Sequence, residues 1–127
     1  MNGRECIKEF LTLFPEHTEH YREHMADYGE LLQHVFYAEV INIPLFDLLK
    51  SNDDLNRIQK YVKFIEHMWS QGDEAVRNVV DVTILERLSD DADVWRSLGK
   101  YISASLREYI NGKLLLQNYL MHHVEPI

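Results

Sequence analysis

Residues 72–91 read GDEAVRNVVDVTILERLSDD and contain both a helix start and a long apolar helix body. Gly72 followed by Asp73 predicts that one helix ends and another begins, because an Asp carboxylate accepts the unpaired N–H groups of a first turn. The apolar side chains cover most of a helical circumference: Val76, Val79, Val80, Val82, Ile84, Leu85 and Leu88. The polar positions form one narrow strip: Glu74, Arg77, Asn78 and Asp81. This pattern predicts a core helix with a single solvent face.

Helical spacing of apolar residues continues on both sides of this stretch, and no alternation typical of a strand persists. The spacing predicts helices over residues 4–13, 15–28, 30–50, 53–71, 73–88, 101–111 and 114–125, and a short helical piece that holds Trp95 and Leu98. Pro44 is expected to break the third segment and start a short helix over 44–50. Gly29, Gly72, Gly112 and Pro126 are the expected helix stops. Residues 89–93 are expected to form a turn and a cap.

Two helices carry apolar stripes that predict which residues are buried. On the helix over 15–28 these are Tyr21, Met25 and Tyr28, and on the helix over 53–71 they are Leu55, Ile58, Val62, Ile65 and Trp69. The short connections make consecutive helices antiparallel neighbours. We therefore expect an all-α, single-domain array over residues 1–127, with about seven to eight helices. The pair 53–71 and 73–88 suggests a short helical-repeat, solenoid-like stack.

Composition narrows the range of functions. The formal charge of −8 argues against a nucleic-acid surface, because binding phosphates needs clustered Lys and Arg. No apolar run approaches the roughly 20 residues of a membrane span. Cys6 is the only cysteine and can form no internal disulfide, which favours the reducing cytoplasm. No motif of a nucleophilic enzyme or a phosphate loop is present, so we expect neither enzymatic activity nor a cofactor.

The negative charge is concentrated in two segments. Residues 15–30 carry five acids against one arginine, and residues 72–93 carry seven acids against two arginines. If the two segments lie side by side, they form one acidic face suited to a basic protein partner; otherwise they are two separate solvated surfaces. The candidate partner-binding residues are Glu74, Arg77, Asn78 and Asp81, with Asp90, Asp91 and Asp93 at the rim.

Three histidines offer an alternative function. His17, His20 and His24 lie at offsets of three and four, so they share one helix face and could hold a metal ion or a small ligand. No HExxH motif and no paired ExxH motif accompanies them, and a solvated polar face is the simpler interpretation. A structural homodimer that buries Leu114–Leu116 and Tyr119 is a further alternative.

Two longer runs carry a resemblance to known proteins. They read YGELLQHVFYAEV, from Tyr28, and FIEHMWSQGDEAVRNVVDVTILERL, from Phe64. Over roughly residues 8–111 the chain resembles a small uncharacterised bacterial all-helical family, similar to immunity or accessory proteins of polymorphic-toxin loci. The resemblance implies an immunity or accessory role, with a toxin as the partner. Together with the composition, it leads us to expect a non-enzymatic cytoplasmic protein that binds a protein partner. The chain departs from this pattern after Gly112.

Overall fold

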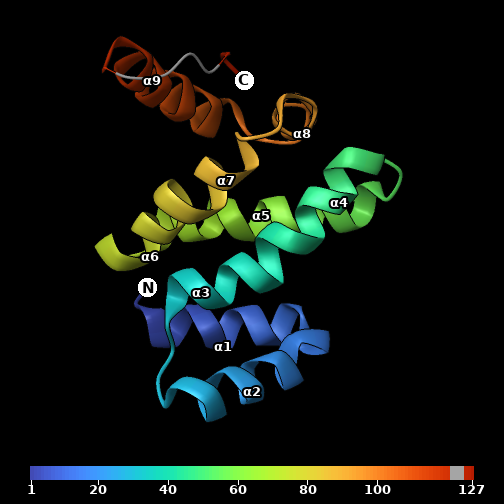
Figure 1. The fold of residues 1–127 in the computed structure, drawn as a ribbon, viewed down its shortest axis with the longest axis vertical. Helices are drawn as coiled ribbons and strands as arrows, with labels where there is room; N and C mark the ends of the chain where they lie inside the picture. The colour runs from blue at the N-terminus through green and yellow to red at the C-terminus, as the bar shows by residue number, and fades with distance from the viewer. Residues whose placement is uncertain (121–124) are drawn as a thin grey trace.

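The structure is a computed structural model that describes residues 1–120 and 125–127, without the side chains of residues 114–120. Every regular element in these residues is helical, which confirms the all-α class (Figure 1). The first half of the chain forms α1 (Gly3–Leu13), the 3-10 turn η1 (Pro15–His17), α2 (Thr18–Tyr28), α3 (Gln33–Tyr37), the π-helical turn η2 (Ala38–Asn42) and α4 (Ile43–Ser51). The second half forms α5 (Leu55–Gln71), α6 (Glu74–Val79), the π-helical turn η3 (Val80–Leu85), α7 (Glu86–Leu88), α8 (Ala92–Leu98) and α9 (Ala104–Leu120).

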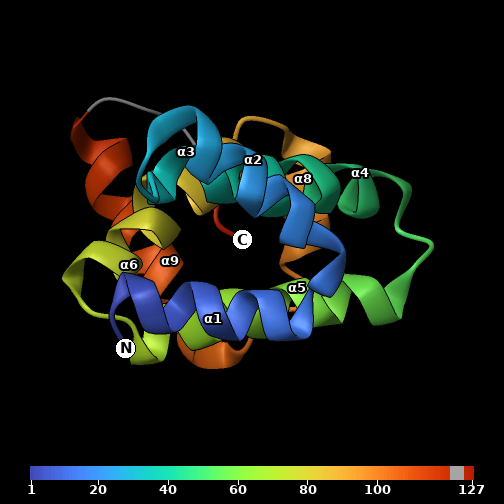
Figure 2. The same cartoon turned by 90° about the horizontal axis from the view of Figure 1, so that it is seen from below.

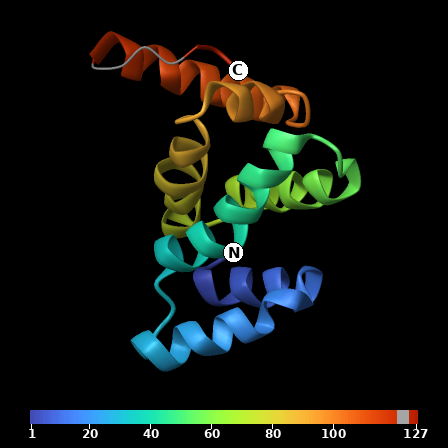
Figure 3. The ribbon, with the colours of Figure 1, turned by 45° about the vertical axis from the view of Figure 1, so that its right-hand side comes forward.

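The helices are arranged along one long axis. α1 and α2 form a hairpin at one end, α3 to α7 occupy the middle, and α8 and α9 lie at the other end (Figures 1 and 3). α5 contacts α4 and α6, α3 contacts α6, and α4 contacts α8. α1 also runs alongside α5 (Figure 2). A regular repeat-like stack of α5 on the helix that follows it is not confirmed.

An aromatic cluster forms the centre of the core where α1, α3 and α5 meet. The Phe14 ring stacks on Tyr61 with centroids 4.6 Å apart and on Phe10 at 4.8 Å. Phe36 and Tyr37 meet Phe10 edge to face. All five side chains are buried, and such aromatic pairs add stabilisation beyond the apolar area that they bury.

The predicted helix ends are largely confirmed. The Asp73 carboxylate accepts a 3.0 Å hydrogen bond from the Val76 N–H, and Asp54 caps α5 in the same way. Gly29 ends α2 in the left-handed conformation, with φ of 72°. Asp91 caps α8 by accepting from the N–H groups of Asp93 and Val94. The three aspartates therefore fix where α5, α6 and α8 begin.

Pro44 does not break the third segment, which corrects the sequence prediction. The chain stays helical because η2 widens the turn before the proline: the Ile43 N–H donates to the Ala38 carbonyl, five residues back. Pro44 then lies in the first turn of α4, where its missing donor is tolerated.

The segment predicted as a helix over 73–88 is likewise helical throughout, and it contains a π turn, η3, between α6 and α7. η2 packs against η3, and the Asn42 amide donates to the carbonyl groups of Thr83, at 3.4 Å, and Ile84, at 3.1 Å. Two adjacent π turns therefore share one buried side chain.

Other sequence predictions failed at single residues. Gly112 does not stop a helix, because α9 continues through it to Leu120. The predicted end at Pro126 follows residues 121–124, which lie outside the described part of the chain. Tyr28 and Leu55 were expected in the core but are 50% and 55% exposed. No helix in the described part of the chain combines the length and apolar content that crossing a bilayer requires.

Candidate functional site

The polar strip predicted on the helix after Asp73 lines an open groove in the structure. Its lining residues are Gly72, Asp73, Glu74, Ala75, Arg77, Asn78, Asp81 and Tyr109, and its volume is about 930 Å³. We call it the α6 groove. Spacings of three and four residues place the strip on one face of α6 and η3, while Val76, Val79 and Val80 on the opposite face are buried. The four predicted central residues are therefore brought together.

Asp81 forms the fixed part of this groove. The Tyr109 hydroxyl, from α9, donates to both carboxylate oxygens of Asp81 at 2.7 and 2.8 Å, and the Lys113 ammonium lies 3.1 Å from Oδ2. Burial, together with this hydrogen bond, raises the pKa of Tyr109 to about 12. The Tyr109 ring also packs against Trp69, with centroids 5.4 Å apart. Asp81 and Tyr109 are thus held in place before any partner arrives.

The other three central residues of the groove have no such hydrogen bonds or ion pairs in the described part of the chain. Glu74, Arg77 and Asn78 are exposed, and their side chains form no hydrogen bond or ion pair with the described residues. Their polar groups can therefore contact another molecule without breaking a contact inside this one.

Two of the three predicted rim residues, Asp91 and Asp93, form ion pairs within the molecule. The Lys50 ammonium on α4 lies 2.9 Å from Asp91 and 3.5 Å from Asp93, and Arg96 lies 3.8 Å from Asp93. The Val94 N–H, followed by Lys50, lowers the pKa of Asp91, and the hydrogen bond to Asp91 raises the pKa of Lys50. Asp91 and Asp93 therefore join α8 to α4, and only Asp90 is exposed without a side-chain contact among the described residues.

The two acidic segments do not form one face. α2 lies at one end of the molecule, the turn over 89–93 lies toward the other, and α1 lies between α2 and α6 (Figures 1 and 3). The negative charge of residues 15–30 is therefore separate from the α6 groove.

The three histidines of the alternative site serve three separate contacts. His17 Nε2 lies 2.9 Å from the Tyr61 hydroxyl, His20 Nε2 lies 3.4 Å from Glu39, and buried His24 accepts from the Leu32 N–H at 3.0 Å. Among the described residues, no group of three His, Cys, Asp or Glu side chains is placed to hold a metal ion.

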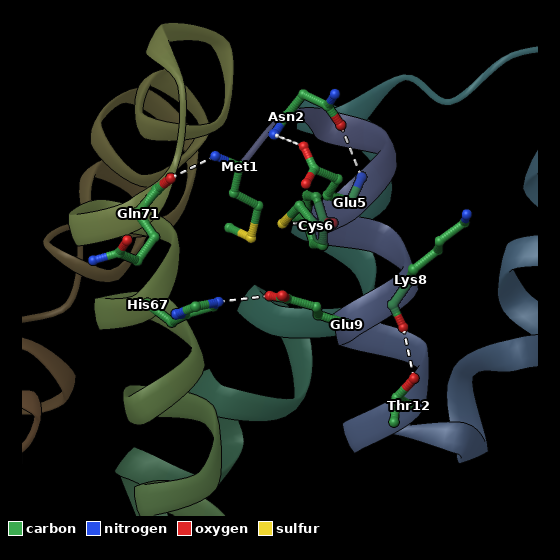
Figure 4. A network of polar contacts seen from close by, with 10 residues as sticks. Met1, Asn2, Glu5, Cys6, Lys8, Glu9, Thr12, His67 and Gln71 are labelled. Carbon is green, nitrogen blue, oxygen red and sulfur yellow. Dashed lines mark hydrogen bonds and ion pairs between the residues drawn. The ribbon is translucent and has the colours of Figure 1, made fainter.

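Sequence reasoning missed a second groove, between α1 and α5. It is lined by Lys8, Glu9, Thr12, Leu13, Lys60, Lys63, Phe64 and His67, with a volume of about 590 Å³. We call it the α1–α5 groove. The Glu9 carboxylate and His67 Nε2 meet across it at 2.6 Å (Figure 4). The net charge of a sequence segment does not reveal this basic cluster. Lys60, Lys63 and His67 nevertheless share one face of a single helix.

Comparisons with known proteins identify the family. A search of curated proteins and a search of solved structures found no match. The family model described as "Domain of unknown function (DUF7674)" matches residues 7–118, which include both grooves. This match covers most of the chain and agrees with the expected uncharacterised helical family. The chain therefore belongs to the DUF7674 family.

Proposed function

We propose that this chain is a non-enzymatic protein-binding module, and that a basic segment of its partner binds in the α6 groove. The observation that supports this proposal is that the groove combines two residues held in place with three exposed polar side chains that have no partner among the described residues. Asp81 and Tyr109 are held by α9, while Glu74, Arg77 and Asn78 stand exposed beside them. A rigid anchor surrounded by uncommitted polar groups is typical of protein interfaces, in which Tyr and Arg are enriched.

The charge of the groove favours a basic partner. Asp73, Glu74 and Asp81 face Arg77 in the lining and Lys113 beside it, so one negative charge is left over. Opposite charges raise the rate of association and fix the register of binding. The resemblance to immunity proteins points to a toxin as this partner and to the cytoplasm as the place of the encounter. The toxin partner and the cytoplasmic location are parts of the proposal, and the experiment described next tests the partner.

A charge-changing variant tests the groove. Glu74→Lys combined with Asn78→Lys adds three positive charges at exposed positions and should leave the fold intact. The matched control is Glu23→Lys with Asp27→Asn on α2, which adds the same charge at exposed positions elsewhere. Tagged wild-type protein is used to capture partners from its native source, and titration calorimetry with the purified partner then compares the three proteins.

We expect the groove variant to bind roughly tenfold more weakly or worse, and the control to bind like wild type. If the groove variant keeps the wild-type affinity, the α6 groove is not the binding site. If the captured partner is a toxin, co-expression with wild-type protein should restore growth, and co-expression with the groove variant should not.

A further inference from the structure

The α1–α5 groove collects positive charge on a protein whose net charge is −8. Three of the chain's six lysines line it: Lys8 on α1, and Lys60 and Lys63 on α5. Neither Lys8 nor Lys63 lies within ion-pair distance of a carboxylate in the described residues. The Lys60 ammonium sits 4.6 Å from the centre of the Phe14 ring. The groove therefore has a local charge opposite to that of the whole molecule.

The surface between these lysines is apolar. Leu13 is 47% exposed although it is a large aliphatic side chain, and the buried Phe64 also belongs to the lining. Exposed apolar surface framed by charged groups is characteristic of a binding site for an amphipathic partner. Burial of the Leu13 side chain against an apolar surface of a partner would be energetically favourable.

The geometry of the groove suits a helix. α1 and α5 run antiparallel, since the Met1 amino group donates to the Gln71 carbonyl at one end and Glu9 meets His67 further along (Figure 4). A pair of antiparallel helices leaves a furrow in which the side-chain ridge of a third helix can pack. The length of α1 corresponds to about three helical turns.

From these observations we infer that the α1–α5 groove binds an acidic amphipathic helix of a partner protein. The apolar stripe of that helix would cover Leu13 above the buried Phe64, and carboxylates on both sides of the stripe would pair with Lys8 and Lys63. The inference does not depend on the function proposed for the α6 groove, because the two sites share no residue and favour segments of opposite charge.

Synthetic peptides test the inference. The probe is a helical peptide of about 14 residues with leucines at positions i, i+3, i+4 and i+7 and glutamates on both sides of that stripe. A second peptide replaces every glutamate with lysine. Binding to the ¹⁵N-labelled full chain is followed by NMR, which also reports whether each variant is folded. The groove variant is Lys8→Glu with Lys63→Glu, and its charge-matched control is Arg87→Glu with Lys100→Glu, both at exposed positions outside the two grooves.

We expect the acidic peptide to bind saturably, to shift the amide signals of Lys8, Leu13 and Lys63, and to lose roughly tenfold in affinity with the groove variant but not with the control. Lys63→Gln, which only neutralises the charge, should give an intermediate loss. Equal binding of the lysine peptide, shifts that map elsewhere, unchanged affinity of the groove variant or no binding would each overturn the inference. A wild-type dimer that sedimentation shows to dissociate in the groove variant would make a second copy of this chain the occupant and would also overturn it.

Discussion

At the scale of single residues, His17 shows how burial turns a surface-type residue into a structural one. Its ring stacks near Phe10, with centroids 5.7 Å apart, and its Nε2 lies 2.9 Å from the Tyr61 hydroxyl. Arg57 donates to the oxygen of that hydroxyl at 3.4 Å, so the hydroxyl proton is available for a neutral His17 ring. Arg57 also pairs with Glu16 at 2.6 Å. The imidazole thus completes a polar chain at the edge of the aromatic core.

This environment predicts a pH dependence of stability. Burial, opposed by Glu16 and assisted by His20 and Arg57, lowers the pKa of His17 below its ordinary value of 6.5. The unfolded chain therefore takes up a proton that the folded chain resists, so the stabilisation is complete above pH 6.5 and is lost as the pH falls below it. We expect the wild-type free energy of unfolding, measured in urea, to decrease from pH 7.5 to 5.5 more steeply than that of His17→Phe.

One titrating group can change this slope by no more than about 1.4 kcal/mol per pH unit. Tyr61→Phe is the matched variant, because it removes the hydroxyl partner and keeps the imidazole. It should cost about 1 kcal/mol already at pH 7.5. Parallel pH profiles for wild type and His17→Phe would show that the burial of His17 has no influence on stability in this range.

At the scale of elements, the pair of π turns is the feature that most shapes the middle of the molecule. A π turn leaves backbone carbonyls without the usual helical partner, and such turns are frequent at functional sites. Here the Asn42 amide from η2 donates to two carbonyl groups of η3, and His34 Nδ1 lies 2.6 Å from the Thr83 hydroxyl. One asparagine therefore holds both turns in register.

Replacing that asparagine should loosen both turns. Asn42→Ala removes the donor to the carbonyl groups of Thr83 and Ile84, and we expect a loss of about 1–3 kcal/mol in the free energy of unfolding. Amide hydrogen exchange should speed up in residues 38–43 and 80–86 before it does so in α5. Thr83→Val removes only the hydroxyl contact with half-buried His34, so it should cost less. An equal loss for the two variants would mean that the cross-turn bonds contribute little.

The sequence predicted elements where a local signal dominates. Asp73 and Asp91 cap helices through their own side chains, and Gly29 ends a helix because it has no side chain. The structure confirms all three as caps or stops. The π turns could not be predicted, because they depend on Asn42 meeting Thr83 across 41 residues of sequence. Gly112 failed as a stop because a single glycine costs a helix only about 1 kcal/mol, which the surrounding α9 sequence offsets.

The same distinction applies to the candidate site. Glu74, Arg77 and Asn78 were predicted correctly as an exposed strip, since helical spacing alone decides which face they share. The engagement of Asp81 by Tyr109 and of Asp91 by Lys50 comes from helices far along the chain. Acidic residues counted as available for a partner were therefore already paired within the molecule.

At the scale of the whole molecule, α8 and α9 form an end unit that is joined to the rest by buried apolar side chains, among them Val94, Leu98 and Leu106, and by a small number of polar contacts. The Asp91–Lys50 pair joins α8 to α4, and Tyr109 and Lys113 join α9 to Asp81. Within the unit, Arg107 donates to the carbonyl groups of Gly99 and Ile127, and the Trp95 indole donates to the Glu125 carbonyl at 3.3 Å. This arrangement positions Tyr109 in the α6 groove, so the groove depends on the docking of the end unit.

The docking contact predicts the order of stability among three variants. Asp91→Asn keeps a capping side chain but loses the charge, Lys50→Ala keeps the cap but loses the pair, and Asp91→Ala loses both. We expect the first two to lower the melting temperature modestly and similarly, and Asp91→Ala to lower it most. Because the folded pKa of Asp91 is lowered from 3.8, its stabilising contribution is present above that value and is lost as the pH falls further, through the folded pKa. The decrease in stability between pH 5 and pH 2 should therefore be shallower in Asp91→Ala than in wild type.

Hydrogen exchange distinguishes local from global effects in the same variants. If Asp91 and Lys50 hold the end unit, the amides of α8 and of the first turns of α9 should exchange faster in Asp91→Ala, while those of α1 and α5 keep their protection. Local unfolding of the end unit should also disturb the α6 groove, because Tyr109 belongs to α9. The affinity for a partner bound in the groove should therefore fall, although Glu74, Arg77 and Asn78 are unchanged. A uniform loss of protection across the chain would instead show that the end unit and the body unfold together, and that the groove is as stable as the core.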